Sequence, residues 1–137
     1  SEFAFAVGEI QDLGVPIAAV TGTNGKTTVT TFTAQLLQAL GKECIACGNI
    51  GRPLSDVALS LRGQEGEGEA REAPDAVVIE VSSYQLEMPS GFWPKAAALL
   101  NLTRDHLARH GDMQRYAEAK ASVCANMRGE GDLVILP

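Results

Sequence analysis

The stretch that decides the fold is residues 17–28, Ile-Ala-Ala-Val-Thr-Gly-Thr-Asn-Gly-Lys-Thr-Thr. Its first four residues are apolar and follow Gly14-Val15-Pro16, so they predict a buried strand. Residues 27–40 carry apolar side chains at helical spacing, and Gly41 then supplies a stop signal. The single apolar face that this spacing predicts consists of Val29, Phe32, Leu36, Leu37 and Leu40.

Working outward, apolar runs and helical patterns alternate along the whole chain. We predict strands at 44–47, 76–81, 96–100 and 133–136, and helices at 54–61 and 113–128. Strands that alternate with helices indicate an α/β domain with an open, mainly parallel sheet and flanking helices. Val77-Val78-Ile79 is apolar throughout, as expected of a central strand covered on both faces.

Composition limits the class of protein. The 137 residues are 45% hydrophobic and 20% charged, which fits one soluble globular domain. No run approaches the roughly 18 apolar residues of a membrane span. The first 14 residues have no basic start, so we expect no signal peptide and no membrane association. The net charge of −6 leaves no broad basic face, so we expect no nucleic-acid partner.

Two further features favour unremarkable interpretations. Residues 63–74 are rich in Gly and Glu and can bury almost nothing, so they predict a flexible acidic surface loop; an acidic docking segment is the alternative. Cys44 and Cys47 lie in an apolar run, and no second cysteine pair could complete a zinc site. We therefore predict reduced cysteines in a buried strand rather than a redox or metal centre.

The turn between the first strand and the first long helix has the residues of a phosphate site. Gly22 and Gly25 allow close backbone approach, the helix start presents N–H groups, and Lys26 adds a positive charge. Thr27 offers a hydroxyl to a magnesium ion on the phosphates. Val20 stands where the full P-loop pattern has a glycine, and the alternative is a plain strand-to-helix turn with a surface lysine.

Other polar residues follow the neighbouring strands. Glu80 ends a buried strand, and Asn101 and His106 follow the next one, so all three should reach the carboxyl edge where α/β sheets bind ligands. Glu80 could hold magnesium or orient a water molecule, or could be a solvated strand-end residue. His106 could equally be a helix cap or a surface residue. His110 has no partner that the sequence singles out.

Lys120 falls within the apolar stripe of the helix predicted at 113–128, four residues after Tyr116. Spacing alone favours a lysine that extends its amine to the rim of the core. The alternatives are a cation held near the phosphates, or a neutral amine that reacts with carbon dioxide to give a carbamate, an anionic metal ligand.

Several of these segments, in this order, resemble the central ATPase domain of the Mur ligases, and the resemblance runs from about residue 14 to residue 125. The segments are Gly22–Thr28, Gly48–Gly51, Glu80–Glu87, Asn101–Leu107 and Tyr116–Lys120. The phosphate turn is also similar to that of folylpolyglutamate synthases, and the family shares Val20 in place of glycine. Residues 80–87, Glu-Val-Ser-Ser-Tyr-Gln-Leu-Glu, specifically resemble the members that add D-glutamate.

The resemblance implies an ATP-dependent, cytoplasmic ligase of peptidoglycan synthesis. Such an enzyme phosphorylates the alanyl carboxylate of UDP-N-acetylmuramoyl-L-alanine, and the amine of D-glutamate then attacks the acyl phosphate. A folylpolyglutamate-type ligase and a nucleotide-dependent switch or binding module stay open as alternatives.

The resemblance also implies roles for individual residues. Lys26 would contact the β- and γ-phosphates, Thr27 and Glu80 would hold one magnesium ion, and His106 with a carbamylated Lys120 would hold a second. Lys26, His106 and Lys120 form the implied catalytic set. The implied ATP-binding residues are Gly22, Thr23, Asn24, Gly25, Lys26, Thr27 and Thr28, and the implied substrate-binding residues are Asn49, Ser82 and Ser83. For Lys120, the resemblance favours a metal-binding carbamate over an amine that extends to the rim of the core.

Family members have three domains, and this chain resembles only the first part of the central one. We therefore expect residues 1–137 to be a partial central domain that carries the phosphate and metal half-site. The N-terminal UDP-sugar domain and the C-terminal domain would be its missing partners, and the chain alone would lack complete ligase activity.

Overall fold

The computed structural model describes residues 1–63, 73–87, 91–105 and 107–137. Its centre is a five-stranded sheet in the order β2-β3-β1-β4-β5, and every neighbouring pair is parallel. The strands are β1 (Ile17–Thr21), β2 (Cys44–Gly48), β3 (Ala76–Glu80), β4 (Ala96–Leu99) and β5 (Leu133–Ile135). The predicted α/β fold with a parallel sheet is confirmed.

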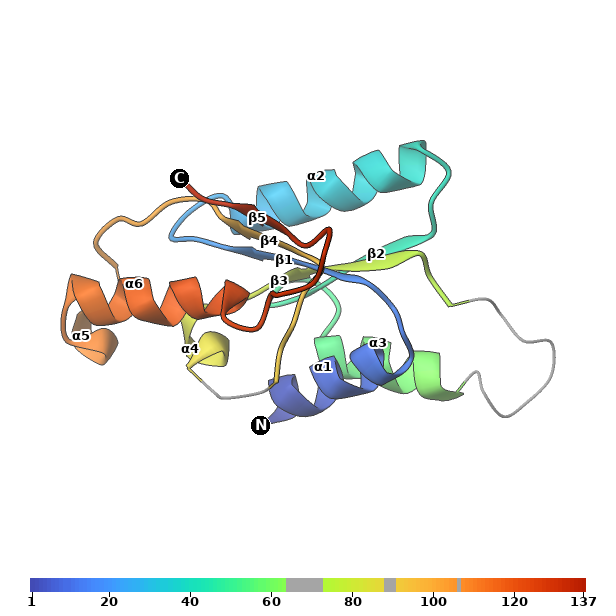
Figure 1. Ribbon diagram of the computed structural model, residues 1–137, viewed down its shortest axis with the longest axis horizontal. Coiled ribbons are helices and arrows are strands. Elements are labelled where there is room, and N and C mark those ends of the chain that lie inside the picture. The colour runs from blue at the N-terminus through green and yellow to red at the C-terminus, as the bar shows by residue number, and fades with distance from the viewer. Residues whose placement is uncertain (64–72, 88–90, 106) are drawn as a thin grey trace.

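Helices cover both faces of this sheet (Figure 1). Helix α2 (Lys26–Ala39) lies on one face, and α1 (Glu2–Asp12) and α3 (Leu54–Arg62) lie together on the other. The remaining helices are α4 (Ser83–Leu86), α5 (Leu107–His110), α6 (Met113–Ala121) and the 3-10 turn η2 (Ser122–Cys124). Helices α4, α5 and α6 gather at the side of Figure 1 on which β1 and β3 end.

The core lies mainly between the sheet and the α1–α3 layer. Val77, Val78 and Ile79 of β3 are fully buried, which confirms the prediction of a central strand. Helix α1 contributes Phe3, Ala6, Val7 and Ile10 to the larger apolar cluster. The sequence analysis assigned no secondary structure to residues 2–12, so this helix was not predicted.

The prediction for the buried face of α2 is wrong in part. Phe32, Leu36 and Leu40 are exposed, at 65%, 51% and 71%, whereas Thr30 and Ala34 face the sheet. Apolar residues occupy more than one side of this helix, and small side chains at the contact let it lie close to the strands. Phe32, Leu36 and Leu40 recur every four residues and therefore share the opposite side.

The helix predicted at 113–128 is also shorter than expected. It ends at Ala121 and continues as the 3-10 turn η2. The Ser122 hydroxyl donates to the carbonyl of Ala119 at 2.7 Å, a local bond that competes with regular helix geometry. The loop predicted at 63–74 cannot be assessed, since residues 64–72 lie outside the described residues.

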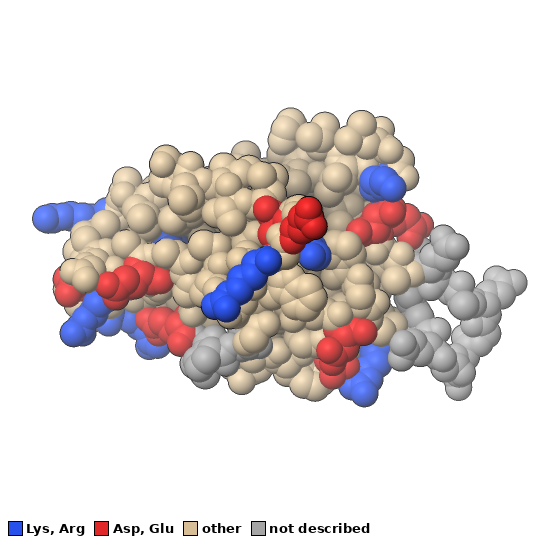
Figure 2. Space-filling view, viewed as in Figure 1, with Lys and Arg blue, Asp and Glu red and all other residues tan. Residues whose placement is uncertain are grey.

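Cysteines and charges add two simple findings. Cys44 and Cys47 are buried in β2 with free thiols, as predicted, and burial raises the pKa of Cys47 to about 12. On the face seen in Figure 2, basic side chains lie near acidic ones. Within the described ranges, no helix is long and apolar enough to cross a membrane.

Candidate functional site: a phosphate loop and the carboxyl edge of the sheet

The turn after β1 is built to present backbone N–H groups. Gly25 stands at the N-cap of α2 with a φ of 83°, a left-handed conformation that favours glycine, and no side chain caps the helix there. Glycine has no side chain that could accept from the N–H groups of the first helical turn, so these groups can donate to a ligand. A 14-residue helix also places partial positive charge at this end, which favours an anion.

Asn101, which follows β4, holds this loop in place. Its side chain accepts from the Asn24 N–H at 2.9 Å and donates to the Asn24 carbonyl at 3.0 Å. Its carbonyl accepts from the Thr23 N–H at 3.1 Å. Lys26 lies over the same loop, where its Nζ donates to the Thr23 carbonyl at 3.0 Å. The loop is thus fixed by the neighbouring strand end.

Glu80 lies beside the loop because β1 and β3 are neighbours. Thr27 Oγ1 donates to Glu80 Oε2 at 2.7 Å, and Asn49 Nδ2 donates to Glu80 Oε1 at 3.3 Å. Gly48 makes room for this arrangement, since it has a φ of 104° and a Cβ there would collide with the Glu80 carbonyl oxygen. The ends of β2 and β3 and the start of α2 therefore meet at a single carboxylate.

The surroundings of this carboxylate leave a charge to be balanced. Glu80 is 3% exposed, and its hydrogen-bond donors are the neutral side chains of Thr27 and Asn49. Among the described residues, none of the ion pairs involves Glu80. Buried charges usually have a counter-charge. In the part of the chain that the structure describes, no group of three or more His, Cys, Asp or Glu gathers. Thr27 and Asn49 each offer a side-chain oxygen beside the carboxylate, and oxygen is the ligand that magnesium prefers.

Lys120 is buried, so its amine does not extend to the rim of the core. It is 2% exposed, and its Nζ donates to the Gly22 carbonyl at 2.9 Å and to Thr21 Oγ1 at 3.4 Å. Burial, with a further contribution from the positive charge of Lys26, lowers the pKa of Lys120 to about 8. A substantial fraction of this amine is therefore neutral slightly above neutral pH.

Ser82 and Ser83 are engaged within the protein. The Ser82 side chain accepts from the Gln85 N–H in a capping box, and the Gln85 side chain accepts from the Ser82 N–H. Ser83 Oγ lies 3.0 Å from His110 Nε2. Both serines begin α4, directly after β3, so they set where that helix starts.

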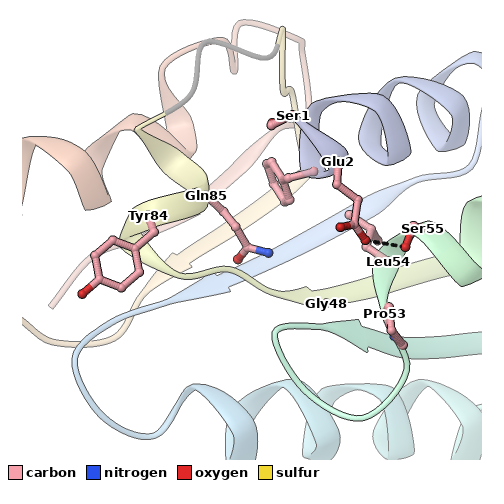
Figure 3. Close-up of a pocket in the computed structure, with 9 residues that line it drawn as sticks. Ser1, Glu2, Gly48, Pro53, Leu54, Ser55, Tyr84 and Gln85 are labelled. Carbon is pink, nitrogen blue, oxygen red and sulfur yellow. Dashed lines mark hydrogen bonds between the residues drawn. The ribbon is translucent and has the colours of Figure 1, made fainter.

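A pocket of about 310 Å³ opens beside this edge, between α1, α4 and the start of α3 (Figure 3). Gln85 and Tyr84 line it from α4, and Glu2 lines it from α1, where the Glu2 carboxylate accepts from Ser55 Oγ at 2.6 Å. Gly48 also lines it, next to Asn49. The pocket is thus continuous with the strand end that carries one partner of Glu80.

The structure brings most predicted site residues to one edge. Lys26, Thr27, Glu80, Asn49 and Lys120 converge around the loop, whereas His106 lies outside the described residues. Three contributors were not assigned a site role from the sequence. They are Asn101, which clamps the loop, Tyr116, whose hydroxyl lies 3.1 Å from Thr23 Oγ1, and His110. Only Asn101 carried a signal, namely its position after a strand.

A parallel sheet whose first strand leads through Gly22–Lys26 into a helix defines an α/β domain of the P-loop class. The family model described as "Mur ligase middle domain" matches residues 20–137. The chain belongs to this family.

Individual relatives agree with this assignment. The chain is 44% identical, over 88% of its length, to a protein of Salinibacter ruber named UDP-N-acetylmuramoylalanine–D-glutamate ligase. MurF ligase from Thermotoga maritima in complex with ADP has a similar fold, with a TM-score of 0.70 and 19% identity over 98% of this chain and 31% of that one. E. coli FolC in complex with DHPP and ADP gives 0.63 at 15% identity, over 99% of this chain and 46% of that one.

The chain is short compared with its relatives. It covers 25% of the Salinibacter ruber protein, and 27% and 24% of two others that carry the same name. The family and the fold are established for this chain. The ligase activity in the names of its relatives, however, is that of proteins about four times as long.

Proposed function

We propose that this chain is the ATP- and magnesium-binding part of a ligase that adds D-glutamate to UDP-N-acetylmuramoyl-L-alanine. The observation that carries the proposal is the hydrogen bond of 2.7 Å between Thr27 and Glu80, directly behind the phosphate loop. This bond joins a hydroxyl and a carboxylate, both of which are common magnesium ligands. It lies at the N-terminus of α2, where the phosphates would bind. The names of the curated relatives support the choice of substrates.

In this proposal the loop residues 22–28 bind the β- and γ-phosphates of ATP. The N–H groups at the start of α2 would donate to phosphate oxygens, and Lys26 would neutralise part of their charge. Lys26 Nζ already lies 3.0 Å from a loop carbonyl, so it is positioned over the loop. Thr27 and Glu80 would hold a magnesium ion, which supplies further neutralisation when bound.

Lys120 would act in the same site as a carbamate. Its neutral amine would attack the carbon of carbon dioxide: an N–C bond would form, one C=O π bond would open with its electron pair passing to oxygen, and one proton would leave the nitrogen to water. The lowered pKa of this buried lysine makes the neutral amine available. The carbamate and His106 would then provide ligands for a second magnesium ion. The carbamate nitrogen would keep one N–H, which could still donate to the Gly22 carbonyl, whereas the two carbamate oxygens would only accept hydrogen bonds.

The substrate would approach from the side of Asn49 and the pocket lined by Tyr84 and Gln85. Its carboxylate and the γ-phosphate repel each other, so the cationic groups of this edge must neutralise both before attack. Ser82 and Ser83 would then act by fixing the start of α4 beside the substrate. The chain would work as a partial central domain, with the sugar-binding and closing domains supplied by the rest of a longer, cytoplasmic ligase of cell-wall synthesis.

Two alternatives have less support. A folylpolyglutamate-type ligase shares the fold at 15% identity, whereas the 44% identical relative is named a D-glutamate ligase. A nucleotide-dependent switch or binding module would have to discriminate strongly between ATP and ADP, since a ligand shifts a conformational equilibrium only through its differential affinity.

Calorimetric titration of Mg-ATP tests the proposal directly. We expect saturable binding to this chain that weakens at least tenfold in Lys26→Ala, because one charge-assisted phosphate contact is lost. Lys42→Ala is the matched control, since Lys42 pairs with Asp75 on the surface, and it should bind like wild type. Equal binding by Lys26→Ala would contradict the phosphate site. In the longer protein, D-glutamate-dependent phosphate release with UDP-N-acetylmuramoyl-L-alanine tests the reaction itself.

A further inference from the structure

A cluster of polar and aromatic side chains, which we call the His110 cluster, lies next to the end of β3 that carries Glu80. It consists of Ser83, Tyr84, Glu87, His110 and Tyr116, contributed by α4, the residue that follows it, α5 and α6. His110 Nε2 lies 3.0 Å from Ser83 Oγ, and His110 Nδ1 lies 3.0 Å from Glu87 Oε1. The imidazole stacks on Tyr84 at 5.8 Å and contacts Tyr116 at 5.1 Å between ring centres.

The direction of the hydrogen bonds follows from the donor groups. An ionised carboxylate can only accept hydrogen bonds, so Nδ1 of His110 must carry a proton and donate a hydrogen bond to Glu87. Arg109 binds the other Glu87 oxygen at 2.8 Å and lowers the pKa of Glu87, which keeps that carboxylate ionised. With Nδ1 protonated, Nε2 of a neutral imidazole is an acceptor, and the Ser83 hydroxyl donates to it.

This order of serine, histidine and carboxylate is that of a nucleophilic triad, but its burial excludes that use. Ser83 is 2% exposed and His110 is 6% exposed. A nucleophile must reach a substrate atom, and the side chain of Ser83, the first residue of α4, is buried. The cluster therefore acts on its own surroundings rather than on a bound molecule.

The surroundings of the cluster are three parts of the proposed site, namely the end of β3, the phosphate loop and Lys120. Ser83 lies three residues after Glu80, so the Ser83–His110 bond fixes the turn that follows β3. Tyr116, which the imidazole contacts, places its hydroxyl 3.1 Å from Thr23 Oγ1 in the phosphate loop. Lys120 Nζ lies 5.0 Å from the centre of the Tyr116 ring. His110 thus contacts Ser83, which follows the end of β3, and Tyr116, whose hydroxyl lies beside the phosphate loop.

We propose that His110 is a positioning residue that, through Ser83 and Tyr116, holds the end of β3 and the phosphate loop in their binding geometry. The inference rests on the proposed function, since the geometry in question is that of an ATP and magnesium site. The carboxylate of Glu87 sets the orientation of the imidazole, and the hydroxyl of Ser83 is the group that His110 holds.

Titration of Mg-ATP into variants of this chain tests the role. His110→Phe keeps a ring against Tyr116 but removes both hydrogen bonds, and we expect affinity to fall on the order of tenfold. His110→Gln keeps an amide that can pair with Ser83, and we expect it to recover affinity to within roughly threefold of wild type. Ser83→Ala should weaken binding in the wild type but have no further effect in His110→Phe, because both changes remove the same bond.

The outcomes separate the two proposals. Lys26-dependent binding that is equally strong in wild type and His110→Phe would overturn the role of His110 and leave the proposed function intact. Additive effects of Ser83→Ala and His110→Phe would also overturn it. Absence of Mg-ATP binding in wild type would remove the proposed function, and this inference with it. The ¹⁵N spectrum of His110 gives a readout that does not depend on ATP: protonated Nδ1 is expected at pH 8, and protonated Nε2 would contradict the orientation by Glu87.

Discussion

Thr27 Oγ1 and Glu80 Oε2 lie 2.7 Å apart although 53 positions separate them in the chain. The sheet creates this contact, because Glu80 pairs with Val20 in the register of β3 and β1, and α2 begins only six residues after Val20. The carboxylate at the end of β3 therefore lies against α2, the helix that follows the neighbouring strand β1. The pairing of β1 with β3 therefore sets the geometry of this edge.

Replacing Glu80 by glutamine tests the metal role of this edge. Glu80→Gln keeps the size of the side chain and an oxygen that can accept from Thr27, but it removes the negative charge. We expect the gain in ATP affinity on adding Mg²⁺, compared with EDTA, to fall by roughly tenfold or more, a typical loss when a metal site is altered. Glu43→Gln on the exposed surface is the control and should retain the full gain. An unchanged gain in Glu80→Gln would show that the carboxylate binds no magnesium.

Gly48 provides a test of the packing behind Glu80. Gly48→Ala forces a side chain into a left-handed backbone and against the Glu80 carbonyl oxygen, so it should destabilise the protein. Gly41→Ala is a matched control, because Gly41 has a φ of 80° but nothing within 4 Å of an added Cβ. Gly41→Ala should cost about 1–2 kcal/mol, the usual penalty of that conformation. In urea unfolding we expect Gly48→Ala to cost clearly more; equal costs would mean that the collision is relieved without loss.

The sequence predicted those parts of the fold that depend on local pattern. The strands at 17–20, 44–47 and 76–81 were recognisable because buried parallel strands are apolar throughout. The buried side of α2 was not, since apolar residues surround this helix and only its contact with the sheet chooses Thr30 and Ala34 over Phe32 and Leu36. Tertiary packing, rather than periodicity, makes that choice.

The site shows the same division. Residues that follow strands, such as Glu80 and Asn101, could be placed at the carboxyl edge from topology alone. His110 could not, because its partners Ser83 and Glu87 are 27 and 23 positions away in sequence and approach it only when α4 packs near α5 and α6. Lys120 was recognised as unusual, but spacing alone favoured an amine at the rim of the core. Its burial involves Thr21 and Gly22, which are distant in sequence and accept hydrogen bonds from its amine.

The lowered pKa of Lys120 predicts a pH dependence of stability. Its pKa is about 8 in the folded protein against 10.5 for an ordinary lysine, so between these values the unfolded state binds more protons. Stability should therefore rise with pH through this window, by up to roughly 3 kcal/mol from Lys120 alone. Burial raises the pKa of Cys47 and of Tyr116, and these groups act in the opposite direction. The difference between wild type and Lys120→Met in urea unfolding from pH 7 to 10.5 isolates the lysine, and a constant difference would contradict the lowered pKa.

The carbamate proposed for Lys120 makes a prediction that involves Lys26 as well. With ¹³C-bicarbonate at pH 8.5, we expect one carbamate resonance that disappears in Lys120→Gln and on acidification, because only a neutral amine reacts with carbon dioxide. The positive charge of Lys26 contributes to the lowered pKa of Lys120, so Lys26→Ala should raise that pKa and reduce the carbamate signal at the same pH. Lys42→Ala removes a surface lysine that is bound to Asp75 and should leave the signal unchanged. A resonance that persists in Lys120→Gln would place the carbamate on another amine, and its absence in wild type would leave Lys120 acting through its bond to the Gly22 carbonyl instead.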